Sequence, residues 1–126
     1  MTTAPKPVGA YTPIVRAGEW LIVSGQVGID NNGQMAGGTG PELRQAIANL
    51  EAQLATQGAR LDQVVKTTVF LRHMSDYQVM NEVYIECFGD HRPARSAVGV
   101  AELPIGALIE IEAWAWVGPV ADEGAS

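Results

Sequence analysis

The segment from Leu108 to Val117 constrains the fold more than any other part of the chain. It reads LIEIEAWAWV, in which, from Ile109 onward, small or branched apolar residues alternate strictly with glutamates and tryptophans. Successive side chains of a β-strand point to opposite faces, so this alternation predicts a strand with two unlike faces. The odd-numbered residues, from Ile109 to Val117, are expected to pack in a core against helices.

The even-numbered face of the same strand carries Glu110, Glu112, Trp114 and Trp116. These side chains cannot share the core with the odd-numbered residues, so they face either water or another subunit. Two tryptophans on an exposed sheet face would form an apolar patch of the kind that marks interaction sites. The pattern therefore favours burial of this face against other copies of the chain.

Two segments have the periodicity of amphipathic helices, and each follows a sequence with the form of a capping box, Thr39–Glu42 and Ser75–Gln78. The expected inward side chains are Leu43, Ile47, Leu50 and Leu54 in the first helix, and Tyr77, Met80, Tyr84 and Phe88 in the second.

Apolar and β-branched runs predict strands at residues 14–16, 20–24, 64–72, 95–101 and 108–117. The Asp30-Asn31-Asn32-Gly33 segment is expected to form a turn. The resulting order is β-β-α-β-α-β-β, which predicts an α+β fold with both helices on one face of a mixed sheet.

A chain of 126 residues has the length of one domain, and no linker, repeat or low-complexity segment divides it. We therefore expect a single domain over residues 1–126, with a core of roughly residues 5–117 and a flexible polar tail at 118–126.

The net charge of −6 and the pI of about 4.7 argue against a nucleic-acid partner, which requires a clustered basic face. No apolar run has the length of a membrane span, so no membrane partner is expected. Cys87 is the single cysteine, which excludes an internal disulfide and is compatible with a reducing compartment. These features together favour a cytoplasmic protein.

Five short motifs occur in order along the chain: Gly9-Ala10-Tyr11, Ser24-Gly25-Gln26, Val65–Phe70, Asn81-x-x-Tyr84, and Pro93–Ser96 together with Ile109–Ala113. Together they resemble the Rid family, the reactive intermediate deaminases also called YjgF proteins. The resemblance implies a chorismate-mutase-like (YjgF-like) fold, with a mixed six-stranded sheet and two helices on one face. It also implies a homotrimer whose sheets form a central barrel, with a cleft at each subunit interface.

The resemblance assigns catalytic roles to Arg95, Glu110 and Ala97. A guanidinium offers two parallel donors to a carboxylate, and Arg95 is expected to hold the carboxylate of a 2-imino acid. The alternative for Arg95 is a structural salt bridge with Glu110 or Glu112. Glu110 is expected to orient the attacking water and transfer its proton. Ala97, where many catalytic members have cysteine, would hold that water through its backbone carbonyl.

Four further residues are expected to shape the substrate pocket. Tyr11 would close it against the substrate side chain, or else serve only in packing. Ser24 and Gly25, at a strand end, would offer backbone N–H groups to an anion, or else form a tight turn. Asn81 matches a pocket residue of the family, or else makes a surface hydrogen bond.

The resulting hypothesis is a hydrolytic deaminase that converts reactive enamines or 2-imino acids to 2-keto acids and ammonia. The chemistry implied needs no cofactor, and the spacing of His73, His91 and Cys87 does not fit a metal site. One alternative is a non-catalytic trimer of the same fold that binds small carboxylates or has a regulatory role. An endoribonuclease is disfavoured by the acidic composition.

Overall fold

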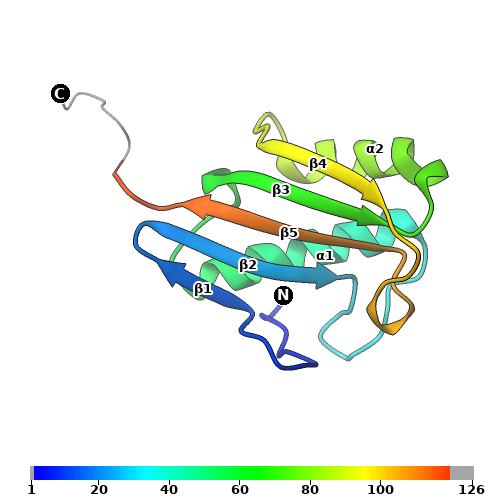
Figure 1. The fold of residues 1–126 in the computed structure, drawn as a ribbon, viewed down its shortest axis with the longest axis horizontal. Helices are drawn as coiled ribbons and strands as arrows, with labels where there is room; N and C mark the ends of the chain where they lie inside the picture. The colour runs from blue at the N-terminus through cyan, green and yellow to red at the C-terminus, as the bar shows by residue number, and fades with distance from the viewer. Residues whose placement is uncertain (1, 120–126) are drawn as a thin grey trace.

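The predicted C-terminal strand lies at the centre of the sheet. A computed structural model describes residues 2–119, which form an α+β fold with a five-stranded sheet in the order β1-β2-β5-β3-β4 (Figure 1). The elements are β1 (Ile14–Ala17), β2 (Trp20–Val27), α1 (Thr39–Ala55), β3 (Val64–Leu71), α2 (Tyr77–Phe88), β4 (Ala94–Gly99) and β5 (Ile109–Trp116). Most of the predicted tail, residues 120–126, lies outside the described part of the chain.

The sheet is mixed, as the order of elements predicts. β5 pairs antiparallel with β2 on one side and with β3 on the other, whereas β3 and β4 run parallel and are joined by α2. A parallel pair needs a crossover connection, and α2 supplies it. Both helices cover the same face of the sheet, α1 behind β2 and β5, and α2 behind β3 and β4 (Figure 1).

The six strands that the family resemblance implies are not found in residues 2–119, which form five. After β2 the chain turns at once, because Asp30 Oδ1 accepts hydrogen bonds from the backbone N–H groups of Asn32 and Gln34. This turn leaves room only for an isolated bridge between Ile29 and Met35. The turn predicted at residues 30–33 is confirmed.

The core has the composition that the periodicity predicts. Ile109, Ile111, Ala113 and Ala115 of β5 are fully buried, and all four predicted inward residues of α1 are also buried. Val117, at the end of the series, is only half-buried. On the opposite face of β5, Trp114 and Trp116 are 43% and 39% exposed.

Both predicted capping boxes are wrong, and the side chains of the first one make tertiary contacts instead. Gly38 is the N-cap of α1, and Thr39 Oγ1 donates a hydrogen bond to Asp76 Oδ2 at 2.6 Å, joining the starts of the two helices. Glu42 Oε1 accepts the backbone N–H of Leu108 at 2.8 Å, just before β5. α2 begins after a short 3₁₀ turn, and its N-cap Asp76 makes no side-chain capping bond within residues 2–119.

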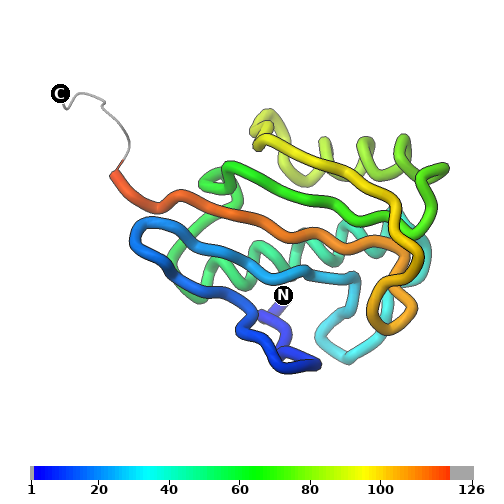
Figure 2. Tube along the Cα trace, viewed as in Figure 1, coloured from blue at the N-terminus to red at the C-terminus, as the bar shows by residue number. Residues whose placement is uncertain are grey.

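The N-terminal segment lies near β2 and α1, at the β1 side of the sheet, and is fixed to α1 and to the turn that follows β2 (Figure 2). Gln53 Nε2 donates to Pro5 O at 2.9 Å, and the backbone N–H of Thr3 donates to Asn31 Oδ1 at 3.0 Å. This path carries Tyr11 to the end of the hairpin strands. None of the helices in residues 2–119 is long and apolar enough to span a membrane.

We expect Gly28→Ala to lower the free energy of unfolding by about 1–3 kcal/mol, the range typical of overpacking. A Cβ at position 28 would lie 2.5 Å from Glu42 Cα, so β2 and α1 would have to separate. Urea unfolding at one fixed chain concentration measures the effect. Gly9→Ala is the control, since its Cβ would approach other atoms no closer than 3.5 Å, and an equal loss in both variants would contradict the explanation.

Candidate functional site

A β-bulge in β2 forms the base of the site. Val23 pairs with Ala113 and Gln26 with Ile111, so Ser24 and Gly25 together lie opposite Glu112 alone. An extra residue bends the strand and increases its local twist, and bulges often adjoin active sites for that reason. Ser24 and Gly25 therefore lie within β2 and not at its end, where the sequence analysis placed them.

Gly25 lies directly beneath the carboxylate of Glu110. A Cβ on Gly25 would lie 1.8 Å from Glu110 Oε2, so only glycine permits this approach. Ser24 has a different role from the one expected. Its backbone N–H donates to Pro13 O at 2.8 Å and its Oγ donates to Thr12 O at 2.7 Å, so Ser24 fixes the segment beside Tyr11 and does not offer its N–H to an anion.

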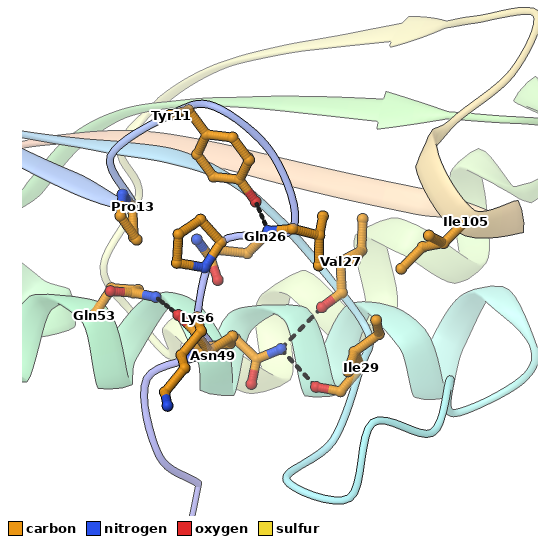
Figure 3. Close-up of a pocket in the computed structure, with 13 residues that line it drawn as sticks. Lys6, Tyr11, Pro13, Gln26, Val27, Ile29, Asn49, Gln53 and Ile105 are labelled. Carbon is orange, nitrogen blue, oxygen red and sulfur yellow. Dashed lines mark hydrogen bonds between the residues drawn. The ribbon is translucent and has the colours of Figure 1, made fainter.

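Tyr11 and Glu110 line the same pocket, as expected. This pocket, of ≈ 200 Å³, is lined by Val8, Tyr11, Ser24, Gly25, Val27, Pro104, Ile105 and Glu110. A smaller cavity of ≈ 80 Å³ adjoins it beneath the N-terminal segment and shares Tyr11, Val27 and Ile105 with it (Figure 3). Tyr11 Oη accepts the backbone N–H of Val8 at 3.4 Å (Figure 3), and both residues line both pockets.

The pKa of Glu110 is raised above its usual value. Burial is the larger cause, and the negative charge of Glu112 on the same face adds to it. A carboxyl group with a raised pKa retains a proton more readily near neutral pH, which suits a general acid that later acts as a base. The environment of Glu110 thus agrees with the predicted proton-transfer role.

Arg95 lies on the other face of the sheet, against α2. Its Nη2 donates to Tyr77 Oη at 3.0 Å, its Nη1 contacts Met80 Sδ at 3.5 Å, and its guanidinium carbon lies 4.9 Å from the centre of the Tyr84 ring. Tyr84 Oη is itself hydrogen-bonded to Thr67 Oγ1 at 2.8 Å. These aromatic contacts hold the cation without neutralising it, since cation–π attraction involves no opposite charge.

The predicted alternative for Arg95, a salt bridge with Glu110 or Glu112, is not formed within one chain. The salt bridges within residues 2–119 join Arg16 to Glu19, Arg44 to Glu86 and Arg60 to Asp62. The register explains why. Thr67 of β3 is paired with Arg95 on one side and with Ala113 on the other, and these side chains face the helices. Phe70 is paired with Val98 and with Glu110, and these side chains face the opposite side of the sheet. One chain therefore does not bring Arg95 and Glu110 together.

Ala97 and Asn81 lie with Arg95. Ala97 is two residues along β4, on the same face as Arg95, and its side chain packs against the core. Asn81 is half-buried on α2, four residues after Tyr77 and three before Tyr84, so it shares the helix face that contacts Arg95. The predicted site thus divides into two half-sites: Tyr11, Ser24, Gly25 and Glu110 on one, and Arg95, Ala97 and Asn81 on the other.

Comparisons with known proteins identify the family of the chain. Residues 1–117 match the model of the family described as endoribonuclease L-PSP. The 2-iminobutanoate/2-iminopropanoate deaminase of Mus musculus is 43% identical over 120 residues, which cover 94% of this chain and 89% of the mouse protein. The chain belongs to this family. The resemblance to the Rid family that the motifs predict is therefore confirmed.

Two solved structures share the fold. RidA from an Antarctic Psychrobacter bacterium is 36% identical, with a TM-score of 0.88 over 91% of this chain and 94% of that one. TdcF of Escherichia coli, solved with bound serine, is 32% identical, with a TM-score of 0.87 over 91% and 94% of the two chains.

Sequence reasoning missed two features of this Rid family site. Tyr77 was expected to pack inward, but it is partly exposed and contacts the Arg95 guanidinium instead. Ile105, between Pro104 and Gly106, lines the pocket beside Glu110 and had no assigned role. The spacing of Tyr77, Met80 and Tyr84 did indicate that they share one helix face. Periodicity alone does not show whether such a face packs in the core or binds an arginine side chain.

The part of the chain between residues 2 and 119 holds no cluster of three metal-ligating side chains.

We expect Glu110→Gln to become more stable relative to the wild type as the pH rises. A carboxyl group whose pKa is raised by folding stabilises the protein fully only below its unfolded pKa, and that contribution is lost as the pH rises through the folded value. Urea unfolding between pH 4 and pH 7 measures the difference. Glu82→Gln, which removes the same charge from the exposed side of α2, is the control. A ¹³C NMR titration in which the Glu110 carboxyl ionises at or below the usual pH would refute the assignment.

Proposed function

We propose that this protein hydrolyses reactive enamines and 2-imino acids to 2-keto acids and ammonia, without a cofactor. The observation that carries the proposal is the presence of two groups suited to that chemistry. Arg95 is a fixed cation with no carboxylate partner within residues 2–119, and Glu110 is a pocket carboxyl group with a raised pKa. The deaminase named among its relatives acts on substrates of this kind.

The two groups can act on one small molecule only if different copies of the chain supply them. Their positions on opposite faces of the sheet exclude a shared contact within one chain. The face that carries Glu110 also exposes Trp114 and Trp116, with which Trp20 makes edge-to-face contacts at 5.8 and 5.2 Å. Such an apolar face favours association. We therefore infer a homotrimer with sheets inward, in which each cleft combines Arg95 of one copy with Glu110 of the next.

In this proposal each group has its own step. Two N–H groups of Arg95 bind the substrate carboxylate, and its contacts with Tyr77 and Tyr84 limit the rotation of the guanidinium. Glu110 protonates the imine nitrogen and then accepts a proton from water as the water oxygen bonds to C2. The Ala97 carbonyl accepts the other hydrogen of that water. Glu110 then returns the proton to nitrogen. As the C–N bond breaks and ammonia leaves, the hydroxyl on C2 gives its proton to the Glu110 carboxylate, so the water oxygen becomes the keto oxygen and Glu110 is again protonated.

A non-catalytic, carboxylate-binding trimer is the second candidate, because the serine-bound TdcF structure is that of a relative with a small carboxylate ligand. It would use Arg95 in the same way but would not require proton transfer by Glu110. An endoribonuclease, the activity in the description of the family model, is opposed by the net charge of −6, since binding a polyanion requires clustered cations.

A coupled assay tests the catalytic proposal. A threonine dehydratase generates 2-iminobutanoate, and semicarbazide traps the imine that survives. We expect Arg95→Ala to lower kcat/KM by about a hundredfold, since lost charge-assisted hydrogen bonds of about 1.5–3 kcal/mol correspond to one to two factors of ten. Arg95→Lys keeps the positive charge but lacks the planar guanidinium, so its kcat/KM should lie between those of the wild type and Arg95→Ala. Ligand binding by a wild-type protein that leaves the imine intact would instead support the second candidate.

Mixing variants tests whether the site is shared between chains. Arg95→Ala and Glu110→Gln chains should each have little activity alone, but when co-assembled at equal ratio they should regain activity. In randomly mixed trimers about one site in four would combine two intact halves. Native mass spectrometry of differently tagged chains verifies co-assembly. A co-assembled mixture without activity would place both groups of each site in the same chain and would overturn the shared cleft.

A further inference from the structure

Ile105 has a backbone conformation that its side chain disfavours. Its φ of 50° and ψ of 33° lie in the left-handed region, and it is the one non-glycine residue with a positive φ among residues 2–119. A β-branched residue in this region is a rare and strained occurrence, and such strain is concentrated at functional sites. Glycine or asparagine would adopt the same backbone conformation more easily.

The fold gains little from this side chain. Ile105 is 54% exposed and lies outside the hydrophobic core cluster. The turn that carries it is nevertheless held on its C-terminal side. The backbone N–H of Ala107 donates to Pro104 O at 3.1 Å, and that of Leu108 donates to Glu42, whose side chain is buried at 2% exposure. The strained side chain is thus kept in one place without contributing to core packing.

That place is the wall between the Glu110 pocket and the smaller cavity beside it. Ile105 lines both, and Figure 3 shows it beside Val27 at the edge of the cavity. The amide side chains that also line this cavity are already bonded to backbone carbonyls. Asn49 Nδ2 donates to Val27 O and Ile29 O, and Gln53 Nε2 donates to Pro5 O (Figure 3). The cavity is therefore left with a predominantly apolar surface for a ligand.

We propose that Ile105 determines substrate specificity by contacting the side chain of the imino acid, and that it selects apolar side chains of three or more carbons. Such a side chain would extend from C2, near Glu110, past Ile105 and Val27 into the adjoining cavity. The inference rests on the proposed function, because it places the reacting carbon near Glu110. A methyl side chain would be too short to reach Ile105, whereas a branched one would bury its surface against it.

Two substrates that differ only in the side chain test the proposal. An L-amino-acid oxidase with catalase generates 2-iminopropanoate from alanine and 2-imino-4-methylpentanoate from leucine, and semicarbazide traps the remaining imine. Ile105→Asn keeps the left-handed backbone accessible and replaces the apolar surface with a polar one. We expect kcat/KM for the leucine-derived imine to fall about tenfold or more, chiefly through KM, and that for the alanine-derived imine to change less than about twofold.

Thermal unfolding separates specificity from stability. Ile105→Asn and Ile105→Gly should unfold at the wild-type temperature or above it, because both relieve the strained backbone. Ile85→Asn is the matched control, since Ile85 is similarly exposed on α2 and lines neither pocket. It should leave the ratio of the two kcat/KM values unchanged. An equal loss for both substrates in Ile105→Asn, or an unchanged ratio, would overturn the inference and leave the deaminase proposal intact.

A wild-type protein that hydrolyses neither imine would count against the proposed function but would still leave the inference testable. Calorimetric titration with pyruvate and with 4-methyl-2-oxopentanoate then measures binding without catalysis. Tighter binding of the branched keto acid, lost in Ile105→Asn, would support Ile105 as a specificity residue. Equal affinities for both keto acids in the wild-type protein would exclude that role.

Discussion

The alternation of β5 at the centre of the sheet is the constraint on which both the core and the site depend. Its odd-numbered residues fill the interface with the helices, and both neighbouring strands take their register from it. A shift of one residue would bury two glutamates and two tryptophans against α1 and expose isoleucines, at a large cost in free energy. The position of Glu110 on the face away from the helices is therefore fixed by core packing.

The bulge in β2 then determines what surrounds Glu110. Because Gly25 has no side chain, the carboxylate lies against the backbone of β2, and Tyr11, Val27 and Pro104 complete the pocket around it. Water is partly excluded there, and the nearby charge of Glu112 further disfavours ionisation. A fold element that interrupts strand pairing thus produces a chemical property, the raised pKa of one carboxyl group.

Features that depend on local periodicity could be predicted from the sequence. The spacing of apolar residues predicts which side chains of β5 and of α1 are buried, and the structure reproduces both sets. The identity of the site residues rested on family motifs, and spacing alone would not have separated Glu110 from Glu112.

Features that depend on tertiary contacts could not be predicted in this way. Thr39 and Glu42 have the form of a capping box, but Asp76 and Leu108 take their hydrogen bonds, and these partners are distant in sequence. Tyr77 fits the apolar periodicity of α2 but supports Arg95, because a phenol can pack and donate or accept at once. The left-handed backbone at Ile105 contradicts residue preference, as strained functional positions do.

The two half-sites differ in their position within the sheet, and this difference links assembly to chemistry. Glu110 lies on the central strand, whereas Arg95 lies on β4, an edge strand that within residues 2–119 pairs only with β3. An uncovered edge strand invites pairing or contact with another chain. In the proposed trimer a second copy would cover this edge with the surface that carries Tyr11 and Glu110. The contact that removes the exposed edge would also complete the site, so the catalytic groups would meet only in the assembled protein.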